Sequence, residues 1–78
     1  MSDKTSQHRL RFKEARALKG TQKEIAKILG VTETHLRELE NGRSVPGTKL
    51  LIRIESYLGV PGKELFPDLY SPDFYLSD

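Results

Sequence analysis

The sequence predicts an all-α protein, a compact domain of five short helices joined by brief loops. Apolar residues recur every three or four positions along most of the chain, which is the spacing of a helix with one buried face. Glycine and threonine residues divide this pattern into short segments, and no segment shows the alternation of a β-strand. With 78 residues and no cysteine, the chain forms one domain at most and has no disulfide framework.

The first helix is expected to follow a polar arm, residues 1–8, that we expect to be flexible. The helical pattern runs from Arg9 to Lys19, and Gly20 is expected to end it. The residues available for its buried stripe are Leu10, Phe12, Ala15 and Leu18. This helix therefore has one face to bury against the rest of the domain.

A threonine is expected to start each of the next two helices. Thr21 is a typical N-cap, and Glu24 three residues later completes a capping box for a helix over Gln22–Leu29. Thr32 is the second expected N-cap, for a helix over Glu33–Glu40. Both helices should therefore begin at defined residues.

The connection between these two helices is the most informative segment. Only Gly30, Val31 and Thr32 separate them, and a turn this short that begins with glycine makes the two helices cross steeply. Ala26 has almost no side chain, so the third helix can approach the second closely. We expect a shared apolar interior of Ile25, Leu29, Val31, Leu36 and Leu39. The third helix would then expose its outer face and its first turn to solvent.

Two further helices are expected after this pair. One starts at Thr48 and ends at Gly59, and a shorter one covers Lys63–Phe66. The longer helix has apolar residues at Leu51, Ile54 and Leu58, with Leu50, Ile52 and Tyr57 beside them. We divide the chain into the arm, residues 1–8, a domain, residues 9–66, and a C-terminal tail, residues 67–78.

Residues 22–41 resemble the helix-turn-helix of the lambdoid repressor and Cro family of DNA-binding transcriptional regulators, also described as XRE-like. The resemblance extends over residues 9–66, and its further matches are Glu40-Asn41-Gly42-Arg43, Pro46, the pattern Leu51, Ile54, Leu58-Gly59-Val60, and Glu64-Leu65-Phe66. It implies the lambda-repressor-like fold, whose second motif helix lies in the major groove. Double-stranded DNA is the implied partner.

The resemblance also implies roles for single residues. The outward residues of the third helix would read base edges: Thr32, Glu33, Thr34, Arg37 and Glu38. The residues that would contact phosphates are Gln22, Lys23, Lys27, Asn41 and Arg43. Arg16 and Glu40 match an ion pair of the family that ties the first helix to the third. Structural interpretations stay open for several of these: Thr32 as an N-cap alone, Glu33 as a partner of the helix dipole, and Arg37 with Glu38 as a solvated face.

The sequence departs from the family pattern in two places that affect these roles. Gly20 is followed directly by Thr21, so the connection is one residue short, and we expect Leu18 to supply the missing apolar contact. Glu33 and Glu38 stand where Gln, Arg or Lys are common. A carboxylate repels phosphate but accepts a hydrogen bond from cytosine N4, which predicts a selective reader whose affinity comes from basic residues elsewhere.

The C-terminal part of the chain differs from the rest in charge. The first 63 residues contain all 13 Lys and Arg and 7 of the 11 acidic residues, whereas the last 15 contain four acidic residues and no basic one. Its aromatic side chains either fold back on the domain or form an interface. If they form an interface, we expect a homodimer through Leu65, Phe66, Leu69, Tyr70, Phe74 and Tyr75.

The expected function is a sequence-specific regulator of transcription, a repressor that binds an inverted repeat as a homodimer. The alternative is a protein-interaction module on the same fold, an antitoxin or antirepressor that uses the acidic third helix or the tail. We expect no enzyme, metal or cofactor, because there is no nucleophile–base pair and no glycine-rich phosphate loop, and His8 is far from His35. Without a membrane span or signal peptide, we expect a cytoplasmic protein.

Overall fold

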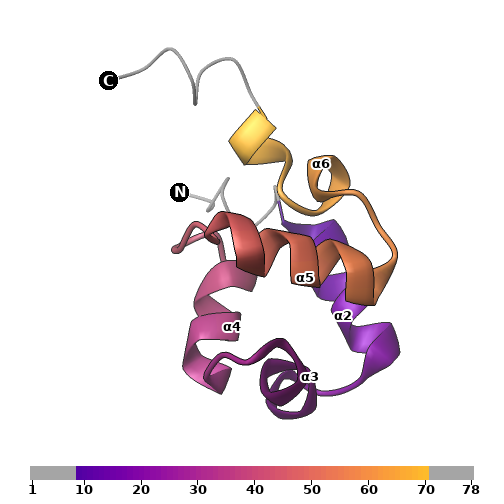
Figure 1. Cartoon of the computed structure of the whole chain (residues 1–78), viewed down its shortest axis with the longest axis vertical. Helices are drawn as coiled ribbons and strands as arrows, with labels where there is room; N and C mark the ends of the chain where they lie inside the picture. Colours follow the sequence, from indigo (N-terminus) through magenta and orange to yellow (C-terminus); the bar gives the residue numbers. More distant parts are fainter. Residues whose placement is uncertain (1–8, 71–78) are drawn as a thin grey trace.

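The computed structural model describes residues 9–70, and all the regular secondary structure within them is helical (Figure 1). Five α-helices and a final 3₁₀ helix follow one another, and no strand is present among the described residues. Their bounds are α2 Leu10–Lys19, α3 Gln22–Leu29, α4 Glu33–Glu40, α5 Thr48–Leu58, α6 Gly62–Leu65 and η1 Pro67–Tyr70. The predicted all-α fold of five short helices is confirmed.

The predicted starts of α3 and α4 are confirmed down to single hydrogen bonds. The Thr21 hydroxyl accepts from the backbone N–H of Glu24 at 3.1 Å, and the Glu24 carboxylate accepts from the N–H of Thr21 at 2.9 Å. The Thr32 hydroxyl accepts from the N–H of His35 at 3.0 Å. These caps satisfy backbone donors that have no partner inside the helix. α5 begins at Thr48 as expected, with Gly47 before it and no side-chain cap.

The core lies between the helices, and all five contribute to it. Its buried apolar residues are Phe12, Ala15, Ile25, Ala26, Leu29, Leu36, Leu39, Ile54, Leu58, Val60, Leu65 and Phe66. The rings of Phe12 and Phe66 pack with their centroids 4.9 Å apart, which joins the first helix to the end of α6. Burial of these side chains supplies the main free energy that holds the helices together.

The steep crossing of α3 and α4 is confirmed, and Figure 1 shows α3 end-on beside α4. Gly30 adopts the left-handed conformation, with φ 78°, that the short turn requires. The N–H of Val31 donates to the carbonyl of Ala26 at 3.0 Å, which closes the end of α3. The expected shared interior is present, with Val31 half-buried at its edge.

The predicted buried stripe of α2 is wrong at two positions. Leu18 is 85% exposed and Leu10 is 54% exposed, so Leu18 does not supply the missing apolar contact. The other two predicted residues, Phe12 and Ala15, are buried. Arg9 and Arg16 lie three and four residues from Phe12, on the same inner side of the helix. The short connection after α2 is held by a polar contact, because Arg16 Nη1 donates to the Gly20 carbonyl at 3.0 Å.

Two residues expected at a dimer interface lie in the core of the chain itself. Leu65 and Phe66 are fully buried, so their side chains have no surface to offer a second copy. The next residues form η1 on the same core, with Leu69 half-buried against it and Tyr70 exposed. The first part of the predicted tail therefore folds back on the domain. Phe74 and Tyr75 lie outside the described residues.

Candidate nucleic-acid interface

The outer face of α4 carries the side chains that were predicted to read bases. Thr32, Glu33, Thr34 and Arg37 are exposed, and Glu38 is half-buried. The Thr32 hydroxyl accepts one hydrogen bond as the N-cap, which leaves its own O–H free to donate to another group. The structural and the base-reading roles of this residue are therefore compatible.

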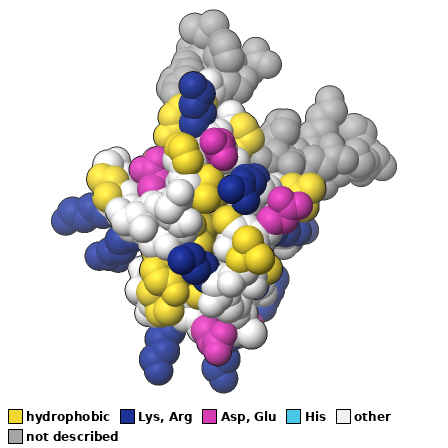
Figure 2. Space-filling view, turned by 90° about the vertical axis from the view of Figure 1, so that its right-hand side faces the viewer, with side chains coloured by type: hydrophobic (Ala, Val, Ile, Leu, Met, Phe, Trp, Pro, Cys, Tyr) yellow, Lys and Arg dark blue, Asp and Glu magenta, His cyan; other side chains and the backbone are white. Residues whose placement is uncertain are grey.

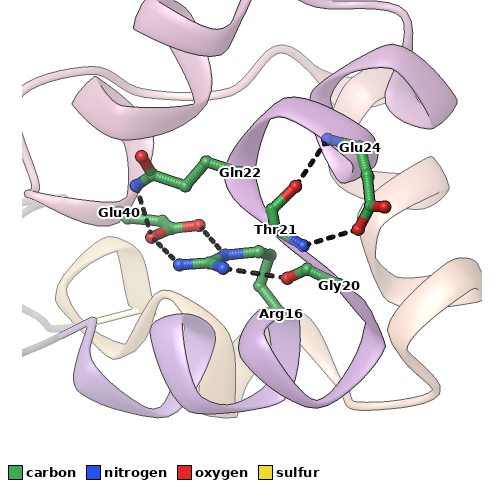
Figure 3. A network of polar contacts seen from close by, with 6 residues as sticks. All are labelled: Arg16, Gly20, Thr21, Gln22, Glu24 and Glu40. Carbon is green, nitrogen blue, oxygen red and sulfur yellow. Dashed lines mark hydrogen bonds and ion pairs between the residues drawn. The ribbon is translucent and has the colours of Figure 1, made fainter.

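The inner side of the C-terminal turn of α4 is anchored by a buried carboxylate. Glu40 is fully buried and accepts from Arg16 Nε at 2.7 Å and from Arg16 Nη2 at 3.1 Å. Figure 3 shows the fork-shaped guanidinium facing this carboxylate, with its other nitrogen turned to Gly20. The ion pair implied by the family resemblance is therefore confirmed. A bidentate pair of this kind fixes orientation as well as charge.

Gln22 completes this network from α3. Its Nε2 donates to Glu40 Oε1 at 3.1 Å, so the Glu40 carboxylate lies between Arg16 and Gln22 (Figure 3). Three helices thus meet at one carboxylate, and α4 is braced by both of its neighbours. Among the described residues, no buried side-chain nitrogen or oxygen lacks a hydrogen-bond partner. The contact of Gln22 with a phosphate stays a prediction.

The other residues predicted to contact phosphates lie on α3 and just after α4. Lys23 and Lys27 on α3 and Arg43 after α4 are exposed, and Asn41 is half-buried at the C-cap of α4. Figure 2 shows Lys and Arg side chains that project from the end of the molecule where α3 lies. Such side chains are free to contact a polyanion without losing a partner in the core.

Arg9 is a buried charge that the sequence analysis did not identify. It is only 1% exposed, and its guanidinium pairs with Asp68 on η1, with Nη2 at 2.8 Å from Oδ2. The available signal was the spacing of Arg9 from Phe12 and Arg16, which places it on the buried side of α2. Its partner lies 59 residues away, so no local pattern could identify the pair.

One hollow on the surface of the described residues is lined mainly by apolar side chains. An open groove of about 380 Å³ lies between α3 and α5. It is lined by Ile28, Leu29, Ile52, Arg53, Ser56 and Tyr57, which include no acid–base pair. No group of three potential metal-binding side chains occurs within residues 9–70. No helix in that part of the chain is long and apolar enough to span a bilayer.

Comparison with known proteins agrees with this geometry. The family model described as helix-turn-helix matches residues 12–65, which include α3, α4 and most of the core. The chain belongs to the helix-turn-helix family. Within that family, the match agrees with the lambda-repressor and Cro type that the sequence of this helix-turn-helix protein resembles.

One curated relative comes from a bacteriophage. The ImmF control region 10 kDa protein of Bacillus phage phi105 is 54% identical to the helix-turn-helix protein over 33 residues. These residues are 42% of the chain and 37% of the phage protein, so the match spans well under half of that protein's length. No solved structure matches the chain.

Proposed function

We propose that this protein represses transcription by binding an inverted repeat in DNA as a homodimer. The observation that carries the proposal is the combination of an exposed outer face on α4 with a rigid anchor at its inner face. Glu40 ties α4 to Arg16 on α2 and to Gln22 on α3. A helix held in this way presents its outer side chains in one orientation, which sequence reading in the major groove requires.

In this proposal the residues of α4 read bases and the surrounding residues contact phosphates. The readers are Thr32, Glu33, Thr34, Arg37 and Glu38, and the phosphate contacts come from Gln22, Lys23, Lys27, Asn41 and Arg43. The two carboxylates gain a hydrogen bond only where cytosine N4 faces them and are repelled elsewhere. Specificity then comes from α4, and most of the affinity comes from the basic residues beside it.

A dimer is needed because one recognition helix contacts only a few base pairs. Two copies related by a two-fold axis would read half-sites about 34 Å apart. Since Leu65 and Phe66 are buried, the contact between copies must involve other residues, and the remaining candidates from the tail are Leu69, Tyr70, Phe74 and Tyr75. The bound dimer would repress transcription by occluding a promoter. The protein would act in the cytoplasm.

The decisive experiment is a selection of duplexes from a random DNA pool with the full chain, followed by sequencing. Enrichment of an inverted repeat supports both base reading and two-fold symmetry. Lys23→Glu and Arg43→Glu should then abolish binding to the selected duplex, because each replaces an attractive charge by a repulsive one. Lys63→Glu, which changes an exposed residue of α6, is the matched control and should bind nearly as the parent does. Failure of a folded chain to enrich any sequence would refute the proposal.

The readers on α4 have a test of their own. Thr34→Ala or Glu38→Ala should reduce discrimination at one base pair by about 1–3 kcal/mol. Binding to a panel of point-substituted duplexes measures this loss. Variants that discriminate as the parent does would show that these residues are not readers.

The acidic face of α4 also favours a second candidate function. Glu33 and Glu38 would suit contact with the basic surface of another protein, as in an antitoxin or antirepressor. Such a module shows neither sequence preference on DNA nor a log-linear loss of DNA affinity with salt. The selection experiment therefore distinguishes the two functions.

A further inference from the structure

Arg9 lies at the start of α2 and holds two parts of the chain that are distant in sequence. Its Nε and Nη2 donate to the two carboxylate oxygens of Asp68, at 3.1 Å and 2.8 Å. The Arg9 guanidinium also lies 5.0 Å from the centroid of the Phe66 ring. One side of this buried cation is therefore bound to η1 and to the residue before it.

The other side of Arg9 holds the end of the proposed recognition helix. Nη1 donates to the Leu39 carbonyl, at 2.8 Å, and to the Ser44 carbonyl, at 2.5 Å. Leu39 is in the last turn of α4, and Ser44 is in the loop that follows. The Leu39 carbonyl also accepts from the backbone N–H of Gly42 at 3.3 Å, so the Arg9 guanidinium adds a second donor at the end of α4. Leu39 and Ser44 flank residues 40–43, so Arg9 Nη1 binds the chain on both sides of this segment.

Residues 40–43 carry Asn41 and Arg43, two of the residues proposed to contact phosphates. The loop is also held by backbone bonds, since the N–H of Arg43 donates to the Glu38 carbonyl at 2.9 Å. Glu40, at the start of this segment, is also tied to α2 by Arg16, whereas Ser44, just after its end, is bound to Arg9 and through Arg9 to η1. The direction in which Arg43 projects from the molecule is therefore set in part by where the Arg9 guanidinium lies.

Asp68 is what keeps that guanidinium inside the molecule. Arg9 is 1% exposed, and its ion pair within residues 9–70 is with Asp68. A buried cation whose acidic partner is removed is strongly destabilised and moves toward water where it can. Such a movement would release the carbonyls of Leu39 and Ser44 together.

We propose that Asp68 is a positioning residue for DNA binding, acting through Arg9 on the loop that carries Asn41 and Arg43. The proposal rests on the proposed function for its effect on DNA, but the link between Asp68 and the loop exists without DNA. The proposal also predicts a change in DNA affinity of unusual sign. Removal of an acidic charge ordinarily strengthens binding to a polyanion, whereas removal of this one weakens it.

The test compares Asp68→Asn with Glu64→Gln in the full chain. Glu64 is an exposed acid on α6 whose distance to Arg11 is 3.8 Å, so its variant removes a similar charge without touching Arg9. Circular dichroism first establishes a temperature at which each variant is folded. Fluorescence anisotropy then measures affinity for the selected duplex over a series of salt concentrations.

Asp68→Asn should weaken binding by about tenfold, the equivalent of one charge-assisted contact. It should also reduce the slope of log K against log salt by about 1, the value for one lost cation–phosphate contact. In an Arg43→Gln background, Asp68→Asn should have little further effect, because both changes remove the same contact. Asp68→Glu should restore part of the affinity. Glu64→Gln should bind as tightly as the parent or more tightly.

A second measurement does not depend on DNA. The amide of Arg43 should exchange its hydrogen faster in Asp68→Asn than in the parent, and the amide in Glu64→Gln should be unchanged. If Asp68→Asn does not fold, Arg9→Lys serves instead, because one ammonium group cannot reach both the carboxylate and the two carbonyls. Unchanged exchange would overturn the link between Asp68 and the loop. If exchange is faster in Asp68→Asn but the parent does not bind DNA, only the proposed function is refuted. If Asp68→Asn binds DNA as tightly as the parent, or if its effect adds to that of Arg43→Gln, the positioning role is overturned.

Discussion

Replacement of Glu40 by alanine is the sharpest test of how α4 is held. The carboxylate is fully buried and accepts hydrogen bonds from Arg16 at 2.7 Å and 3.1 Å and from Gln22 at 3.1 Å. After Glu40→Ala, the Arg16 guanidinium keeps its bond to the Gly20 carbonyl but loses its counter-charge. The amide of Gln22 loses its partner as well.

The size of the effect follows from the burial of these groups. Removal of one partner of a buried ion pair costs about 3–5 kcal/mol. The Arg16 side chain is 15% exposed and can recover part of its hydration, which favours the lower end of that range. A loss of about 3 kcal/mol corresponds to a fall in Tm of roughly 12–24 °C for a domain of this size.

Thermal and urea unfolding, followed by circular dichroism, measure this loss. Glu64→Ala is the matched control, because its pair with Arg11 is long, at 3.8 Å, and both side chains are about half exposed. The control should change the free energy of unfolding by less than about 1 kcal/mol. The double variant Arg16→Met with Glu40→Leu should be less destabilised than Glu40→Ala, since no charge is left without a partner. Equal stability of Glu40→Ala and Glu64→Ala would refute the assignment of Glu40 as the anchor.

Four other substitutions test separate parts of the fold by urea unfolding. Gly30→Ala should cost about 1 kcal/mol, because the φ of 78° is strained for alanine although no atom lies closer than 3.5 Å to the added Cβ. Thr32→Ala should cost about 1 kcal/mol through loss of the N-cap bond to His35, and an unchanged stability would contradict that role. Leu65→Ala should cost about 2–5 kcal/mol, whereas a near-neutral result would show that Leu65 is not packed in the core. Leu18→Ser should change stability by less than about 0.5 kcal/mol, and a large loss would mean that Leu18 is packed after all.

The helices were predictable because their ends depend on local chemistry. Thr21, Thr32 and Gly30 act on backbone groups within a few residues, so the sequence alone contains the information for the capping box, the second N-cap and the left-handed turn. The family resemblance added the pairing of Arg16 with Glu40, which the structure confirms.

The errors concern which face of a helix is buried and against what. Leu18 is apolar and follows the helical period loosely, but the core is centred on the side of α2 that carries Phe12, and Leu18 points away from it. Leu65 and Phe66 were expected at an interface because they adjoin the aromatic tail. Both side chains are instead buried in the core, and η1 after them packs back on the domain. These outcomes depend on contacts between distant segments, which periodicity within one segment does not contain.

The ion pair between Arg9 and Asp68 affects where this chain can be truncated without loss of the fold described above. The family match covers residues 12–65, and both partners of the ion pair lie outside it. A fragment cut at those limits would keep α3 and α4 but lose the Arg9 cation bound at the end of α4, and it would also lose Phe66 from the core. A fragment that begins before Arg9 and ends after Tyr70 retains all of these contacts. A truncated form of this chain should therefore include both Arg9 and Asp68, and should not be limited to the residues that match the family.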